Sequence, residues 1–125
     1  MASFGAVIPV LRIFDEQKAK EFYVGFLGFQ IEFEHRFGDN FPLYMSVNQS
    51  TCTVHLSEHH GDGSPGASIR IQCDDVDGLS AHLAAKQYRY AKPGPPEVTP
   101  WGSRELRISD PFGNRLTFYQ TRQSP

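Results

Sequence analysis

The chain has 125 residues, a formal net charge of −2 and a hydrophobic fraction of 39%, proportions typical of one soluble globular domain. No Lys/Arg cluster stands out, so nothing in the sequence indicates nucleic-acid binding. No apolar run approaches the roughly 18–20 residues that cross a bilayer, and MASFGAVIPVLRIF lacks the features of a signal peptide, so we expect a cytoplasmic protein without a membrane partner.

The first half of the chain predicts the element order β-α-β-β-β. Val7–Ile13 is a strand candidate, and Pro9, which cannot donate a ladder hydrogen bond, favours an edge or a special pairing there. Asp15 is a plausible helix N-cap and Gly28 a plausible C-cap. Three more strands are expected: Phe29–Phe37, Pro42–Asn48 and Thr51–Ser57.

The helix and the strand after Asp15 show two different periods. Helical spacing places four residues on one apolar stripe: Ala19, Phe22, Tyr23 and Phe26. The following strand alternates strictly, with Phe29, Ile31 and Phe33 against Gln30, Glu32 and Glu34. Both patterns predict elements with one buried face.

The same order of elements restarts after a polar, Gly/Pro-rich linker at 59–66. Ala67–Cys73 alternates as a strand, and Asp75 is a second N-cap, about half the chain after the first. Tyr88–Ala91 is predicted as a short strand and Lys92–Pro100 as a Pro-rich loop. The sequence is therefore a weak internal repeat.

We accordingly expect one α+β domain over 1–125 that contains two βαβββ modules. The first spans about 5–58 and the second about 67–121, and the two sheets pair because each module is too small to bury a core alone.

The closing hairpin, Pro100–Tyr119, is the most informative stretch. Pro111 presets φ for a turn, and Gly113 and Asn114 tolerate positive φ. One face of the hairpin is apolar: Leu106, Ile108, Leu116 and Phe118. The other carries Glu105, Arg107, Arg115, Thr117 and Tyr119. The polar face is either the floor of a binding cavity or a solvated sheet surface.

Metal and thiol chemistry have weak support in the sequence. Cys52 and Cys73 lack CxxC spacing, which favours two reduced thiols in strands, with a disulfide as the alternative. The segment HLSEHH could supply metal ligands, but a Gly/Pro-rich linker begins there, which favours exposed histidines.

Three features together resemble the vicinal oxygen chelate superfamily, the glyoxalase I-like proteins: the paired modules, the opening IFDEQKAKEFYVGFLGF and the ending DPFGNRLTFYQ. Within it, the chain is most similar to bleomycin resistance proteins, through PVLRIFD, FY-x-GFLGF, the Trp-Gly of PWGSRELRISDPFGN and the strand RLTFYQ. The resemblance covers roughly Ala6 to Gln120 and implies the glyoxalase/bleomycin resistance fold, with cupped mixed sheets around a ligand cavity.

Enzymes of this superfamily hold a divalent metal with His and Glu or Gln on paired strands. Carried over, those positions fall near Ile8, Gly66 or Ala67, and Thr117, with a fourth at Thr53 or His55. None of the first three supplies an imidazole or carboxylate, and the chemistry needs about three protein ligands. The resemblance thus favours the branch that binds a drug without catalysis, with no cofactor and no metal. The alternatives are a metal-dependent lyase, isomerase or dioxygenase with a relocated metal, or a binder of another planar molecule.

The resistance branch implies a homodimer with two clefts at its interface and exchange of N-terminal strands, and Pro9 falls in that arm. Bleomycin has a flat bithiazole and a cationic tail, which aromatic rings stack and acidic groups attract. The predicted ligand-binding residues are Trp101, Phe33, His35, Phe37, Phe41, His55, Glu105, Arg107, Thr117 and Tyr119.

Overall fold

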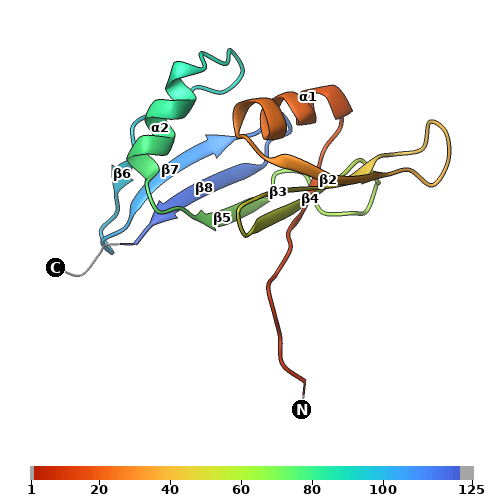
Figure 1. Cartoon of the computed structure of the whole chain (residues 1–125), viewed down its shortest axis with the longest axis horizontal. Coiled ribbons are helices and arrows are strands. Elements are labelled where there is room, and N and C mark those ends of the chain that lie inside the picture. The colour runs from red at the N-terminus through yellow and green to blue at the C-terminus, as the bar shows by residue number, and fades with distance from the viewer. Residues whose placement is uncertain (1, 122–125) are drawn as a thin grey trace.

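Each half of the chain folds into a mixed four-stranded sheet with helices on one face, as the computed structural model of residues 2–121 shows (Figure 1). The first module contains β1 (Val10–Arg12), α1 (Glu16–Lys20), η1 (Glu21–Phe26), β2 (Gln30–His35), β3 (Tyr44–Gln49) and β4 (Cys52–Ser57). The second contains β5 (Ser68–Gln72), α2 (Val76–Ala85), β6 (Glu97–Val98), β7 (Arg104–Ser109) and β8 (Arg115–Gln120).

The strand orders β1-β4-β3-β2 and β5-β8-β7-β6 are the same arrangement repeated. In both sheets the first strand runs parallel to the last, and the remaining pairs are antiparallel. The expected α+β fold of two paired modules is confirmed. No helix within residues 2–121 has the length and apolar character needed to cross a bilayer.

The first helix forms as its sequence predicts. The Asp15 side chain accepts a hydrogen bond of 2.9 Å from the Lys18 N–H, and Gly28 has the positive φ of a C-cap. From Glu21 on, the helix widens to a π-helix, in which the Leu27 N–H donates to the carbonyl of Phe22, five residues back. The predicted stripe is buried at all four positions: Ala19, Phe22, Tyr23 and Phe26.

Two predicted strands are wrong: one is shorter than expected and the other does not form. The strand expected at Val7–Ile13 is reduced to β1, because Pro9 has no N–H to pair and only its carbonyl joins the sheet, accepting from the His55 N–H at 3.0 Å. No strand forms at Tyr88–Ala91, where Gln87 turns the chain with φ of 52° and the Tyr88 ring packs on Phe26 of the first module. The edge strand next to β7 is β6, which lies inside the segment expected to be a loop.

The strict alternation expected for Phe29–Phe37 is also wrong, because β2 contains a β-bulge. Ile31 opposes Val47, but two residues later Phe33 opposes Ser46, so the strand gains one residue and reverses its facing. Ile31 lies on the helix side, and Phe33 lies on the opposite face.

The closing hairpin, β7 and β8, has the predicted facing. Leu106, Ile108, Leu116 and Phe118 are buried beneath α2 and join the core, whereas the alternate residues face away. Gly113 has the predicted positive φ of 85°. Asn114 does not adopt positive φ, and its side chain is used instead.

A buried hydrogen-bond network anchored on this hairpin turn joins the two modules. Asp110 accepts hydrogen bonds from the Tyr23 hydroxyl at 2.6 Å and from the Asn114 side-chain amide at 2.8 Å. Asn114 Nδ2 also donates to the carbonyl of Arg12 at 2.9 Å. Tyr23 and Arg12 belong to the first module. The hairpin turn of the second module is therefore hydrogen-bonded to the helix and to the first strand of the first module.

Burial raises the pKa of Tyr23 well above its ordinary value, and the Asp110 carboxylate raises it further. The phenol therefore stays protonated and donates at neutral pH. The stabilisation linked to this raised pKa is fully present below the unfolded-state value near pH 10 and is lost as pH rises through the folded-state value.

Tyr23→Phe is expected to lower the free energy of unfolding by about 2 kcal/mol, because Asp110 stays buried and loses a donor. The matched control is Tyr88→Phe, since the buried Tyr88 hydroxyl has no hydrogen-bond partner among residues 2–121 and its loss removes no bond described there. Urea unfolding of both variants at neutral pH measures the difference. Equal losses in the two variants would contradict the role given to the Tyr23–Asp110 bond.

Candidate ligand-binding face

The faces of the two sheets that the helices leave uncovered carry the polar and aromatic side chains. In Figure 1 both α1 and α2 lie on one side of the sheets, and the N-terminal segment leaves on the other. The register places the second sheet's Arg70 beside Thr117, and Thr117 beside Arg107, on the uncovered face. The polar hairpin face predicted from the sequence is therefore one side of a bare sheet.

A buried carboxylate with a cationic partner lies at the centre of the second sheet. Glu105 is only 3% exposed, and its Oε2 accepts from Arg70 Nη2 at 2.6 Å and from the Ser103 hydroxyl at 2.8 Å. The Arg70 guanidinium also lies over the Tyr119 ring, 4.9 Å from its centroid. One side of this guanidinium holds the carboxylate, and its face covers the ring.

The hydrogen bond from Arg70 lowers the pKa of Glu105 below its ordinary value, and contacts with Ser103 and the Trp101 indole N–H lower it further, although burial acts in the opposite direction. The same pairing raises the pKa of Arg70. Glu105 is therefore an ionised, fully partnered carboxylate at neutral pH, which is the state of a structural anion and not of a general acid.

Aromatic and histidine rings cluster on the first sheet. The Phe33 ring meets His55 edge-on at 5.7 Å, and the Tyr44 hydroxyl lies 2.7 Å from His55 Nδ1. Next to them, the His35 and Phe37 rings are perpendicular at 4.6 Å. Burial, and then the charge of Asp62, raise the pKa of Tyr44, so its phenol remains protonated.

The structure thus divides the predicted site residues into two groups on separate sheets. The first sheet brings together Phe33, His35, Phe37 and His55. The second brings together Glu105, Arg107, Thr117 and Tyr119. Phe41, exposed in the loop after β2, lies outside both clusters, whereas Trp101, 69% exposed in the turn before β7, contacts the second cluster at Glu105. Within residues 2–121 no ring contact joins Trp101 to the first sheet.

Sequence reasoning missed three residues that organise these faces: Arg70, Ser103 and Tyr44. A signal for Arg70 exists, because the alternation of ASIRIQC and the parallel pairing of β5 with β8 place it beside Thr117. Tyr44 follows in the same way from its antiparallel neighbour Ser57 and the alternate position of His55. No sequence pattern identifies the hydrogen bond from Ser103 to Glu105, which depends on how the chain turns into β7.

The positions where superfamily enzymes hold a metal do not fit one here. Ile8 is apolar, Gly66 has no side chain, and Thr117 supplies a hydroxyl that is nearly buried. His55 is already engaged by Tyr44. Within the described part of the chain, no three His, Cys, Asp or Glu side chains lie close enough to share an ion. This chain's own residues therefore do not assemble a ligand set at the inherited positions.

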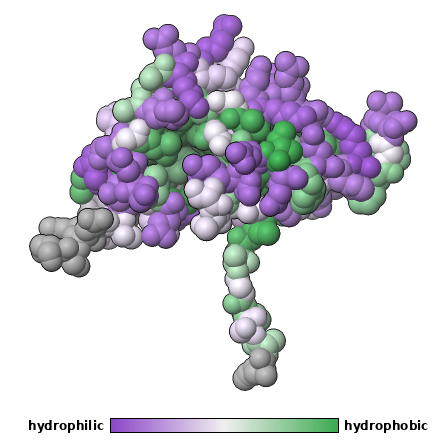
Figure 2. All heavy atoms as spheres, viewed as in Figure 1, coloured by the Kyte–Doolittle hydropathy of each residue, from purple (hydrophilic) through white to green (hydrophobic). Residues whose placement is uncertain are grey.

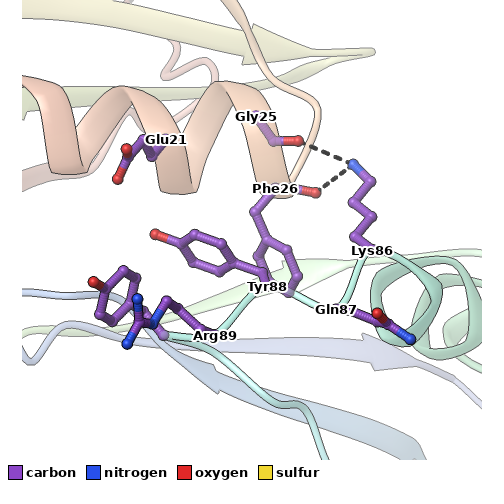
Figure 3. A pocket seen from close by; sticks show the side chains of 8 residues that line it. Glu21, Gly25, Phe26, Lys86, Gln87, Tyr88 and Arg89 are labelled. Carbon is purple, nitrogen blue, oxygen red and sulfur yellow. Dashed lines mark hydrogen bonds between the residues drawn. The ribbon is translucent and has the colours of Figure 1, made fainter.

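A hollow of about 510 Å³ lies on the opposite, helix-covered side (Figure 3). There the Lys86 ammonium donates to the carbonyls of Gly25 and Phe26, and Tyr88 stacks on the Phe26 ring at 4.9 Å. These contacts fasten α2 to the end of η1, so the main polar groups of this hollow already serve the joint between modules. On the bare face, a smaller cavity of about 90 Å³ includes Glu105 and Arg107 in its lining.

Several apolar side chains of the N-terminal arm and of the first module are exposed within residues 2–121. The N-terminal arm, residues 2–9, projects from the body and is largely pale to green in Figure 2. Its Phe4 and Val7 are almost wholly exposed, and Phe37 and Phe41 are exposed on the first module. Exposed rings and aliphatic groups in this number are typical of a surface that meets a partner or a ligand.

The chain is similar to known proteins in sequence profile and in fold. A sequence profile described as a glyoxalase superfamily protein matches residues 1–124. No curated protein matches the chain in sequence. The solved structure of TnmS3, an antibiotic binding protein from Streptomyces sp. CB03234, is similar with a TM-score of 0.76 and 25% identity, covering 97% of this chain and 98% of that one.

Two further solved structures are similar over nearly their whole length. The bleomycin-binding protein from bleomycin-producing Streptomyces verticillus, complexed with copper(II)-bleomycin, has a TM-score of 0.71 and 28% identity, covering 99% of this chain and 100% of that one. A glyoxalase/bleomycin resistance protein from Streptomyces sp. CB03234 has a TM-score of 0.72 and 26% identity, covering 90% and 97%.

Arg70→Met is expected to destabilise the protein more near pH 7 than near pH 4, because it leaves the Glu105 carboxylate buried without its cation. In the unaltered chain, the stabilisation from the lowered Glu105 pKa is present above the ordinary value of 4.5 and is lost as pH falls through the folded-state value. The loss caused by the substitution should therefore shrink in acid.

Unfolding curves at the two pH values measure this pH dependence. Arg115→Met is the control, since Arg115 is an exposed arginine on the same face that opposes Ser109 and not a carboxylate. A loss for Arg70→Met that is independent of pH would show that the Arg70 stem, and not its charge, stabilises the sheet.

Proposed function

Because this chain belongs to the glyoxalase superfamily, we propose that it is a non-catalytic binding protein that sequesters a flat-ring antibiotic of the bleomycin class. The observation that carries the proposal is the bare sheet face, where a hydroxyl at Thr117 and a neutralised carboxylate at Glu105 stand among aromatic rings. Such a face supplies stacking surface and hydrogen bonds, while its central carboxylate is already held by Arg70 and the inherited metal positions lack a ligand set.

Similar proteins support this choice over an enzyme. One similar structure is that of an antibiotic binding protein, and another is a bleomycin-binding protein seen with its drug. Sequestration requires only that the bound ligand is stable in the cleft, so it makes no demand on the missing metal ligands. The family also includes enzymes, and a relocated metal is the result that would favour catalysis.

The two groups of predicted residues come together if the protein is a homodimer. We propose that the N-terminal arm crosses to a second chain, with Pro9 at its base, and that the ring cluster of one chain then faces the hairpin of the other. The exposed Phe4, Val7 and Ile8 support this arrangement. The free energy of the protein falls when a partner covers such apolar side chains and removes them from water.

In this proposal aromatic side chains stack on the flat rings of the drug, and an acidic side chain attracts its cationic tail. Trp101, exposed beside β7, stacks on one side of the flat rings, and a phenylalanine of the partner's first module closes the other. Glu105 cannot attract a cationic tail, since Arg70 already neutralises it. Glu97, its exposed neighbour across β6 and β7, is in no ion pair within residues 2–121 and is the acid placed for that role.

Titration with bleomycin is expected to quench Trp101 fluorescence with a stoichiometry of about one drug per chain. Trp101 is the only tryptophan, so the signal reports one site. Trp101→Ala, followed by calorimetry because the fluorophore is gone, should bind at least about fivefold more weakly, since stacking contributes on the order of 1–3 kcal/mol.

Tyr90→Ala is the control for this substitution, because Tyr90 is a similarly exposed ring on the helix-covered side. Absence of quenching at micromolar drug would contradict the bleomycin proposal. A stoichiometric divalent ion in protein purified without a His tag would instead favour the enzyme alternative.

The arm is tested by a triple substitution, F4S/V7S/I8S, which keeps its length but removes its apolar groups. The dimer should dissociate at least about tenfold more readily, and drug affinity should fall with it, because the cleft needs both chains. Sedimentation velocity measures the dimer. Val98→Ser, at an exposed apolar residue on β6, is the control and should change neither quantity. A dimer unaffected by the triple substitution would exclude arm exchange.

A further inference from the structure

Because the two modules repeat the same fold, each residue at the contact between them has an equivalent residue in the other module. Val10 pairs with His55 in the first sheet as Arg70 pairs with Thr117 in the second. Counting three residues back along each last strand, Cys52 corresponds to Asn114. Arg12 lies two residues after Val10, and Gln72 lies two residues after Arg70, so these two residues are equivalent. The helix N-caps agree with this alignment, because Asp15 and Asp75 follow at the same spacing.

The two ends are closed differently. At one end Asn114 donates to the carbonyl of Arg12, and Asp110 fills the space beside it. By the repeat, Cys52 occupies the place of Asn114 and faces the end of β5, at Gln72 and Cys73. This end is hollow: a cleft of about 410 Å³ opens there, and Cys52, Gln72 and Cys73 all line it.

Both thiols project into this cleft from the same side of their sheets. Cys52 alternates with the buried Val54 and Leu56, and Cys73 alternates with Ile71, so each lies on the helix side and packs partly against the core. They are the chain's only cysteines, both are free, and both are half-buried. A cleft between two modules thus carries one thiol on each wall.

We propose that Cys52 and Cys73 are a modification site, at which a small-molecule disulfide oxidises the pair to a Cys52–Cys73 disulfide that closes the open end of the joint. A disulfide needs the two Cα atoms within about 7 Å. The hollow between the walls provides the space for the strand ends to approach. Within residues 2–121, no hydrogen bond comparable to Asn114–Arg12 crosses the reduced cleft and resists this approach.

The chemistry balances with a disulfide such as oxidised glutathione as oxidant. The Cys73 thiolate attacks one sulfur of the oxidant, forming a mixed disulfide and releasing one glutathione thiolate, which takes a proton. Cys52 then loses its proton and attacks Cys73 Sγ, releasing the second glutathione. Burial raises the pKa of Cys52, which suits it to the second, intramolecular step, where the short distance compensates for a scarce thiolate.

The test is incubation of the folded, full-length protein with oxidised glutathione, followed by intact mass measurement. The expected product lacks two hydrogen atoms, carries no glutathione and has no thiol that reacts with Ellman's reagent. Its melting temperature should rise by roughly 5 °C, and dithiothreitol should reverse the rise, because the bond constrains the unfolded chain.

Cys52→Ser and Cys73→Ser are the matched controls, and each should stop at a single glutathione adduct without the rise in melting temperature. Two glutathione adducts on the unaltered chain, or disulfide-linked dimers on a non-reducing gel, would overturn the proposal. So would a product with the disulfide mass but an unchanged melting temperature, since that bond would not fasten the modules.

Discussion

The buried carboxylate of Asp110 is the contact on which the arrangement of the two sheets depends. It accepts from the backbone N–H groups of Phe112 and Asn114, and so shapes its own turn, and it also accepts from the Tyr23 hydroxyl of the other module. A carboxyl group at this depth is tolerated only with several hydrogen-bond partners around it. The turn that ends the β7 strand and the helix over the first sheet are therefore held in one geometry, and the bare faces follow from it.

The two modules are joined by different contacts at different places. Each module is a sheet with one helical cover, so its core is completed only where the two modules meet. Lys86 fastens the helices, Asn114 fastens β1, and the remaining end is left to the two cysteine-lined walls. The joint is therefore polar and sealed at the end next to Asp110 and hollow at the other end.

The sequence predicts those parts of the fold that depend on local patterns. Helix caps at Asp15 and Asp75, the apolar stripe and the facing of the closing hairpin follow from spacing alone, and all are confirmed. The bulge in β2 is not predictable in this way, because it depends on which residues of β3 lie opposite. The role of Asp110 was missed for a related reason: its turn chemistry is local, but its partner Tyr23 lies 87 residues away.

The same distinction applies to the candidate site. Alternation predicts that Glu105, Arg107 and Thr117 share one face, which is confirmed. It does not reveal that Arg70 neutralises Glu105. The chemistry of a buried carboxylate cannot be inferred until its charge partner is known. That pairing changes the chemistry expected of the face. A free buried glutamate would be a candidate base, whereas a glutamate held by Arg70 and Ser103 fixes the sheet beneath Trp101 and Tyr119. A floor whose central carboxylate is already neutralised discriminates by shape and ring contact, as the proposed binding function requires.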